Sequence, residues 1–336
     1  MSVDADLAAM MDSVFADLRE NTPSFEEMWS RLDDLGLVRL TGPESAGGSG
    51  AGWPEAAELL SASARHGVRV PLAEHDLLAC WLLDATDTPY SPAPRTLALL
   101  DADMRAAGVP WAWDAERVVV VWPCVIEGAD GYRMADIEPS VLSITQGTNM
   151  IGEPRDGVIA EGLAGVPVGP TLIAQLRHKA ALIRAIQVCA ALDRTLELSI
   201  EHVGSRVQFG RPLAKFQAIQ NLISDIAAEA ALSRAATEAA LSRAIADDWT
   251  GSDLEFAVAV ARSCAGHAAS VAVRNAHQVH GAIGTTIEHR LHEYTRAALA
   301  WRSEFGSVRF WDQRVAELAA AAPELWDLIA PAGKSH

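Results

Sequence analysis

The sequence is short of basic side chains and of cysteine. Its 336 residues include 27 Lys and Arg against 44 Asp and Glu, which gives a formal net charge of −17. A surface of this charge repels phosphate backbones and anionic lipid headgroups, so we expect neither nucleic acid nor a membrane as a partner. The four cysteines are Cys80, Cys124, Cys189 and Cys264, and none of them forms a CxxC pair. Their spacing predicts neither a disulfide framework nor a zinc ribbon.

Long apolar runs and a targeting segment are also missing. The longest apolar stretch, Val118 to Ile126, is broken by Pro123 and is far shorter than a membrane span of about 20 residues. The first residues, Met1 to Asp6, lack the basic and apolar regions of a signal peptide. Half of the residues are apolar, which is enough for a large core. We therefore expect a soluble, cytoplasmic protein.

The N-terminal third has the pattern of packed helices. Between residues 6 and 40 the apolar positions recur at helical spacing, and Ser24 stands three residues before Glu27, as in a capping box. The glycine-rich segment 41–52 fits neither a P-loop nor the GxGxxG pattern. We interpret it as a flexible turn before a helix over Pro54–His66.

The rest of the chain changes from strand to helix patterns. The β-branched or aromatic runs are Thr96–Leu100, Arg117–Trp122 and Gly131–Met134, with a hairpin turn at Glu127–Gly131. The predicted long helices are Thr171–Val203, Lys215–Ala246, Leu254–His280 and Arg290–Ala321. Antiparallel packing would bury their apolar stripes in a four-helix bundle. The fold is thus predicted to be mainly α with a small β domain. Its parts are an N-terminal helical domain (1–94), a reduced β domain (95–170) and a C-terminal bundle (171–330).

Two segments between these helices carry candidate ligand-binding residues. In the first, 206–220, Arg206 ends a helix before a turn that contains Gly210 and Pro212. An Arg in such a place suits a pyrophosphate, although a lone Arg at a helix end can also complement the helix dipole or form a salt bridge. In the second, 278–289, Gly281 and Gly284 flank Ala282 and leave backbone open to a flat ligand.

These segments resemble two signatures of the acyl-CoA dehydrogenases, Arg-x-x-Phe-Gly-x-x-(Ile/Leu)-x-x-x-Gln and Gln-x-x-Gly-Gly-x-Gly. The order of the two segments, their separation and the α, β, α domain sequence match as well. In that family the two segments grip the ADP part of a flavin that a neighbouring subunit chiefly holds. The resemblance implies FAD as the cofactor and an assembly of at least two subunits. The implied cofactor-binding residues are Arg206, Gln208, Phe209, Gln217, Gln278, Gly281 and Ala282, the last replacing a family glycine.

The resemblance does not extend to the catalytic base. The family removes a proton α to a thioester with a carboxylate, while hydride leaves Cβ for the flavin. An ungapped count places the usual base at Phe305, before Gly306, and its alternative position at Ala180. Neither side chain can take a proton. Glu304 would be the base if the count slipped by one residue, and otherwise it is a solvated carboxylate.

The β domain also departs from the family. It lacks the Thr-Glu-Pro-x-x-Gly-Ser-Asp-like and Trp-x-Thr-like segments that hold the flavin ring. Trp111, Trp113 and Trp122 could stack on that ring, but core packing is the commoner fate of a strand Trp. These departures resemble the smaller, catalytically depleted subunit of the heterotetrameric, steroid-type acyl-CoA dehydrogenases of actinobacteria.

That resemblance implies a division of labour. A partner subunit would supply the base for dehydrogenation of an acyl-CoA, such as a steroid side-chain thioester, and electrons would pass to an electron-transfer acceptor. Two alternatives remain open. One is a self-sufficient homo-oligomeric dehydrogenase that uses Glu304, and the other is a non-enzymatic scaffold on the same fold.

The sequence offers weak signs of a metal site. Two pairs of histidines stand one helical turn apart, His277 with His280 and His289 with His292. Either pair could share a metal ion, with Glu288 or Glu293 as a third ligand. There is no HExxH motif, and polar helix faces commonly show such pairs. We therefore predict no metal site.

Overall fold

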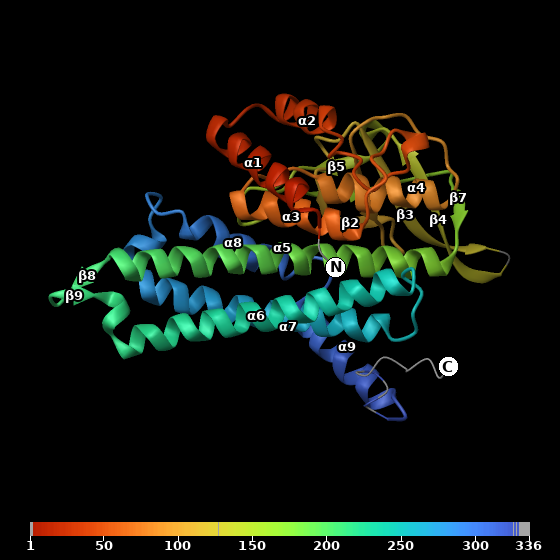
Figure 1. Ribbon diagram of the computed structural model, residues 1–336. Coiled ribbons are helices and arrows are strands. Elements are labelled where there is room, and N and C mark those ends of the chain that lie inside the picture. Colours follow the sequence, from red (N-terminus) through yellow and green to blue (C-terminus); the bar gives the residue numbers. More distant parts are fainter. Residues whose placement is uncertain (1–2, 127, 325, 327, 329–336) are drawn as a thin grey trace. The chain divides into compact units, whose positions relative to one another are not determined.

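The computed structural model describes residues 3–126, 128–324, 326 and 328 (Figure 1). Glu127 of the predicted hairpin turn and the last residues of the predicted bundle domain lie outside these ranges. The chain divides into two compact units between Ala180 and Ala181. The long helix α5 (Pro170–Ser205) spans this division.

Three helices open the first unit: α1 (Ala5–Asn21), α2 (Phe25–Asp34) and α3 (Trp53–His66). The predicted capping box of α2 is confirmed, because Ser24 Oγ accepts the amide of Glu27 and the Glu27 carboxylate accepts the amide of Ser24. Their apolar faces share one core cluster, which includes Met11, Phe15, Leu18, Leu32 and Leu59.

The glycine-rich segment before α3 is held by its own backbone. The amide of Gly48 donates to Pro43 O, and that of Gly50 donates to Gly42 O at 2.9 Å. A Cβ on Gly48 would lie 2.1 Å from Gly42 O, so only glycine permits this close approach. The expected turn is therefore present, but it is tied down rather than flexible.

A buried polar network follows, which the sequence did not predict. Several of its side chains lie on a π-helical segment, η2 (Ala73–Cys80), and on α4 (Trp81–Ala85), which continues from it. Arg39 donates to Asp76 at 2.5 Å, and to Asp84 and Tyr90 at 2.7 Å. Burial, with Arg39 and Arg95 nearby, lowers the pKa of His75 to about 3, and its Nδ1 accepts the amide of Arg95. These groups are occupied with one another, so we assign the network a structural role.

The strands of the first unit form two sheets. One has the order β1 (Arg95–Leu99), β3 (Arg117–Ile126), β4 (Ala129–Ile137), β7 (Val166–Val168), with β1 and β3 parallel and the remaining pairs antiparallel. The other has the order β2 (Arg105–Pro110), β6 (Arg155–Ile159), β5 (Ser143–Thr145), all antiparallel. Val118, Val120 and Val158 belong to a core that both sheets share. Trp122 is buried in that core and Trp111 stacks on Phe25, whereas Trp113 is exposed.

The second unit is helical. After α5 come α6 (Gln217–Ala246) and α7 (Leu254–His280), which run side by side in Figure 1, and α7 also packs against α9 (Val308–Ala321). The stretch Leu254–Thr285 is long and apolar enough to cross a membrane, but half of its most apolar part is buried within the protein. This is the pattern of a core helix in a soluble fold.

The prediction of a single last helix is wrong, because this part of the chain forms two helices. α8 (Leu291–Trp301) ends before a turn, and α9 begins at Val308. In the turn, Phe305 and Gly306 have φ values of 53° and 115°, outside the helical region. Ser307 then caps α9 by accepting the amide of Phe310 at 3.1 Å. The helical periodicity that continues across the break hid it from sequence analysis.

Candidate functional site

The Arg206 segment forms a short hairpin at the end of α5. Strands β8 (Val207–Gln208) and β9 (Arg211–Pro212) pair across a two-residue turn, in which Phe209 has φ 51° and Gly210 has φ 78°. Tight hairpins require positive φ at both turn residues, which is unusual for phenylalanine. Phe209 is nevertheless 90% exposed, so packing within this chain does not explain the strained position.

The hairpin is a basic feature on an acidic protein. Arg206, Arg211 and Lys215 stand within ten residues, and the next acidic residue is Asp225. The Arg206 guanidinium is exposed and forms no ion pair with the residues that the structure describes. Arg211, in contrast, lies over the ring of Phe216 at 4.1 Å. Arg206 and the exposed Lys215 are therefore the cations of this segment that remain available to an anionic ligand.

The Gln278 segment forms a second exposed turn. α7 ends at His280, and Gly281 adopts φ 63° and ψ −143°, a conformation reserved for glycine. A Cβ at Gly281 would have no atom within 4 Å, so the backbone there is open. Gly284 differs, because a Cβ there would lie 2.8 Å from Cβ of His280. The expectation that Gly284 also leaves backbone open to a ligand is corrected: it serves packing.

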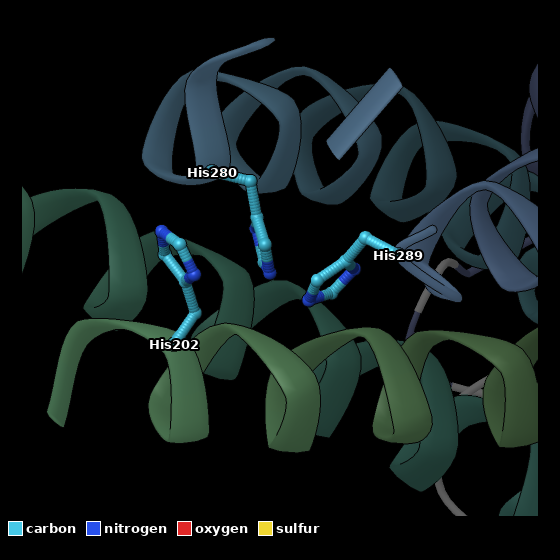
Figure 2. Close-up of side chains that lie close together, drawn as sticks. All are labelled: His202, His280 and His289. Atoms are coloured by element: carbon cyan, nitrogen blue, oxygen red, sulfur yellow. The ribbon is translucent and has the colours of Figure 1, made fainter. Parts of the chain in front are cut away.

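The two segments are neighbours, because the last turns of α5 and α7 meet. The imidazole rings of His202 on α5 and His280 on α7 stack with centroids 4.4 Å apart (Figure 2). All seven residues predicted to bind the cofactor are exposed: Arg206, Gln208, Phe209, Gln217, Gln278, Gly281 and Ala282. Large apolar side chains are exposed on the same segments, namely Val207, Phe209, Ile283 and Ile287, the last 91% exposed. An apolar group of this kind is typical of a surface that a partner covers.

The positions of the family base hold no free carboxylate. Ala180 is fully buried, and the Phe305 ring lies 5.4 Å from the guanidinium carbon of Arg184. Glu304 accepts a hydrogen bond from Arg184 Nε at 2.7 Å, and the two side chains are 17% and 2% exposed. A carboxylate bound to a buried guanidinium is poorly placed to take a proton from a substrate.

A second buried arginine fixes the same turn. Arg262 Nη2 donates to the carbonyl oxygens of Arg302, Glu304 and Gly306 at 3.0, 2.7 and 3.2 Å. Burial and the nearby Arg184 lower the pKa of Arg262 to about 9, against the opposing effect of Glu304. Glu304 is thus the counter-charge of two buried guanidinium groups. Sequence analysis missed both arginines, although each interrupts an otherwise apolar helical stripe.

Comparison with known proteins agrees with this fold. Residues 170–309 match the family model described as acyl-CoA dehydrogenase, C-terminal domain. The chain is similar to this family over those residues, and as a whole it has the acyl-CoA dehydrogenase fold of N-terminal helices, central β sheets and a C-terminal helical domain.

Particular relatives cover nearly the whole chain. The acyl-CoA dehydrogenase IpdE2 of Mycobacterium tuberculosis is 27% identical, over 90% of this chain and 87% of its own. A chain of the ChsE4-ChsE5 complex from Mycobacterium tuberculosis superposes with a TM-score of 0.84 at 20% identity, over 96% of this chain and 99% of that one. A variant of the Tcur3481-Tcur3483 steroid ACAD gives a TM-score of 0.81 at 22% identity, over 94% and 97%.

Proposed function

We propose that this chain is a non-catalytic subunit of an FAD-dependent acyl-CoA dehydrogenase, and that it completes a cofactor site in a partner subunit. The observation that carries the proposal is a contrast between two exposed turns and the two positions of the family base. The Arg206 hairpin and the Gly281 turn are exposed side by side, while the positions of the family base hold Phe305 and Ala180. The chain thus retains a dinucleotide-binding surface and lacks the proton acceptor.

The residues present fit the dinucleotide part of FAD. Arg206 would donate to the pyrophosphate, and the side-chain amides of Gln208, Gln217 and Gln278 would supply further hydrogen bonds. The open backbone at Gly281 and Ala282 would lie against the dinucleotide. The local excess of basic side chains offsets the overall negative charge, which would otherwise repel this ligand. When bound, FAD supplies the acceptor for the hydride, while this chain binds and orients the cofactor.

The partner would provide what this chain lacks. Two of the similar structures, ChsE4-ChsE5 and Tcur3481-Tcur3483, carry the names of two proteins each, and one is called a steroid ACAD. By analogy we propose a heterotetramer with an acyl-CoA dehydrogenase subunit that carries the base. The proposed substrate is a bulky acyl-CoA such as a steroid side-chain thioester, with electrons passing to an electron-transfer acceptor. The exposed Phe209 and Ile287 would be covered in this assembly.

Purification with and without a partner tests the proposal. The chain is produced alone and together with a longer acyl-CoA dehydrogenase encoded beside it, and flavin absorbance and acyl-CoA oxidation are measured. We expect bound flavin and activity only in the co-purified complex. Yellow, active protein from this chain alone would support a self-sufficient enzyme instead. Colourless protein in both preparations would support a scaffold.

A further inference from the structure

Three histidines from separate parts of the second unit converge beside the two exposed segments. His202 lies on α5, His280 ends α7, and His289 lies just before α8 (Figure 2). The ring of His280 lies between the other two, with centroids 4.4 Å from His202 and 4.6 Å from His289. One nitrogen of each residue lies within 4.8 Å of the other two. Neither histidine pair of the sequence analysis forms this cluster. His277 instead contacts Thr295 Oγ1 at 3.0 Å, and His292 Nδ1 contacts His289 O at 2.9 Å.

His280 is oriented like a metal ligand. Its side chain is buried, and Nδ1 donates to the carbonyl oxygen of Ala276 at 2.8 Å. This bond fixes the tautomer in which Nε2 carries a lone pair. Nε2 is itself buried and has no hydrogen-bond partner among the described residues. Metal-bound histidines normally donate their second nitrogen in this way, and an unsatisfied buried acceptor is costly without a ligand.

The other two rings are available in the form that binds metal. Burial lowers the pKa of His202, and His289 and Arg206 add to the effect. Burial also lowers the pKa of His289, where Glu201 opposes the shift and His292 adds to it. A lowered pKa favours the neutral form of each imidazole, which has a lone pair to offer.

His289 must give up one hydrogen bond before it can bind a metal ion. Its Nδ1 accepts the amide of Leu291 at 3.1 Å, which leaves Nε2 as the nitrogen available to the cluster. Before any ion binds, Nε2 therefore carries the proton. Coordination through Nε2 shifts that proton to Nδ1 and exchanges the Leu291 hydrogen bond for a metal bond. The ligand nitrogens must also approach to roughly 3.3 Å, the separation set by tetrahedral Zn–N bonds of about 2.0–2.1 Å.

We propose that His202, His280 and His289 form a binding site for a divalent transition metal ion such as Zn²⁺. Three imidazoles select this class, because Ca²⁺ and Mg²⁺ prefer oxygen ligands. A fourth position is left for water or a partner. The ion would join the last turn of α5, from which the Arg206 hairpin begins, to the end of α7 before Gly281. The inference does not depend on flavin binding, because it concerns this chain alone.

Metal titration of the full chain tests the site. Protein stripped with a chelator is titrated with Zn²⁺ by calorimetry, and Cu²⁺ is added for electron paramagnetic resonance. We expect one ion per chain and nitrogen couplings from three imidazoles. His280→Asn, His202→Asn and His289→Asn should each weaken Zn²⁺ binding at least about tenfold. The matched control is His267→Asn, an exposed α7 histidine paired with Asp312, which should bind as the wild type does.

Thermal unfolding provides a second measurement. Zn²⁺ should raise the melting temperature of the wild type and of His267→Asn but not that of His280→Asn, because only a bound ion stabilises the folded state. If His280→Asn does not fold, the partly exposed His202→Asn gives the same comparison. The proposal is overturned by the absence of stoichiometric binding, by unchanged affinity in the cluster variants, or by an equal loss in the control. If the assembled complex contains no flavin but the chain still binds Zn²⁺, that result counts against the proposed function and not against the metal site.

Discussion

The second unit contains the same dipeptide twice, with positive φ at both places but in opposite surroundings. Phe209-Gly210 and Phe305-Gly306 each follow a helix, and all four residues have positive φ. Phe209 is exposed at the tip of the hairpin, whereas Phe305 faces the buried Arg184. The difference lies in residues distant in sequence, because Arg184 and Arg262 fix one turn and leave the other free. Local conformation alone therefore does not distinguish an exposed turn from one that is fixed by contacts within the chain.

Removing the charge of Glu304 should break the fixed turn. Glu304→Gln leaves two buried guanidinium groups without their counter-charge, and we expect the free energy of unfolding to fall by about 3–5 kcal/mol. Denaturant unfolding measures this. Turnover per assembled complex should change little, because we propose that the partner subunit supplies the base. A large drop in kcat with unchanged stability would instead assign it that role. Glu317→Gln on α9, an exposed partner of Arg314, is the control and should cost little.

Removing the charge of Arg206 should affect binding and leave folding intact. Arg206→Ala removes one charge-assisted contact to phosphate, so flavin affinity in the assembled complex should fall by roughly 1.5–3 kcal/mol. Melting temperature should stay unchanged, because Arg206 forms no ion pair within the described residues. Flavin retention after gel filtration measures the effect, and Arg309→Ala on the exposed face of α9 serves as the control. Equal flavin occupancy in both variants would remove Arg206 from the cofactor site.

The two glycines of the paired turns sharpen the comparison. Gly306→Ala combines an unfavourable φ with a clash, because the new Cβ would lie 2.6 Å from Trp311 Nε1. Gly210→Ala has the unfavourable φ but no atom within 4 Å. We expect a loss of unfolding free energy of about 2 kcal/mol or more for the first and about 1 kcal/mol for the second. Losses of equal size would show that packing does not separate the two turns.

Sequence analysis predicted the parts that depend on local or familiar patterns. The capping box at Ser24, the helices around α7 and the nearness of the two glycine-bearing segments belong to this group. It failed for features that depend on contacts between residues distant in the sequence. The break between α8 and α9 depends on Arg262, which binds carbonyl oxygens some forty residues downstream. The histidine cluster likewise draws on three segments, so helical spacing along the sequence does not reveal it.

Titration should separate the two regions in metal-free protein. The ionisable groups near the exposed Phe209 turn are histidines. The pKa of His280 is lowered to about 4 from 6.5, mainly by burial and also by the nearby His202, His289 and His277, while a hydrogen bond to Ala276 O opposes the shift. Near the fixed turn Arg262, whose pKa is lowered to about 9, stays charged throughout the acidic range. The unfolded chain then binds more protons than the folded one between pH 6.5 and pH 4, so the stability from a neutral His280 is lost as pH falls through this range.

The size of this loss should be about 1 kcal/mol, reduced by solvent screening because the cluster is only partly buried. Unfolding measured with a chelator present at pH 7, 6, 5 and 4 gives the slope, and His280→Asn should flatten it. His75 in the first unit also titrates below its ordinary pKa, so the wild type keeps a background slope that the variant must share. His267→Asn is the control for a histidine outside the cluster. Identical slopes in wild type and His280→Asn would mean that this ring does not remain neutral in the folded state, and its unpartnered nitrogen would then need another explanation than a waiting ligand.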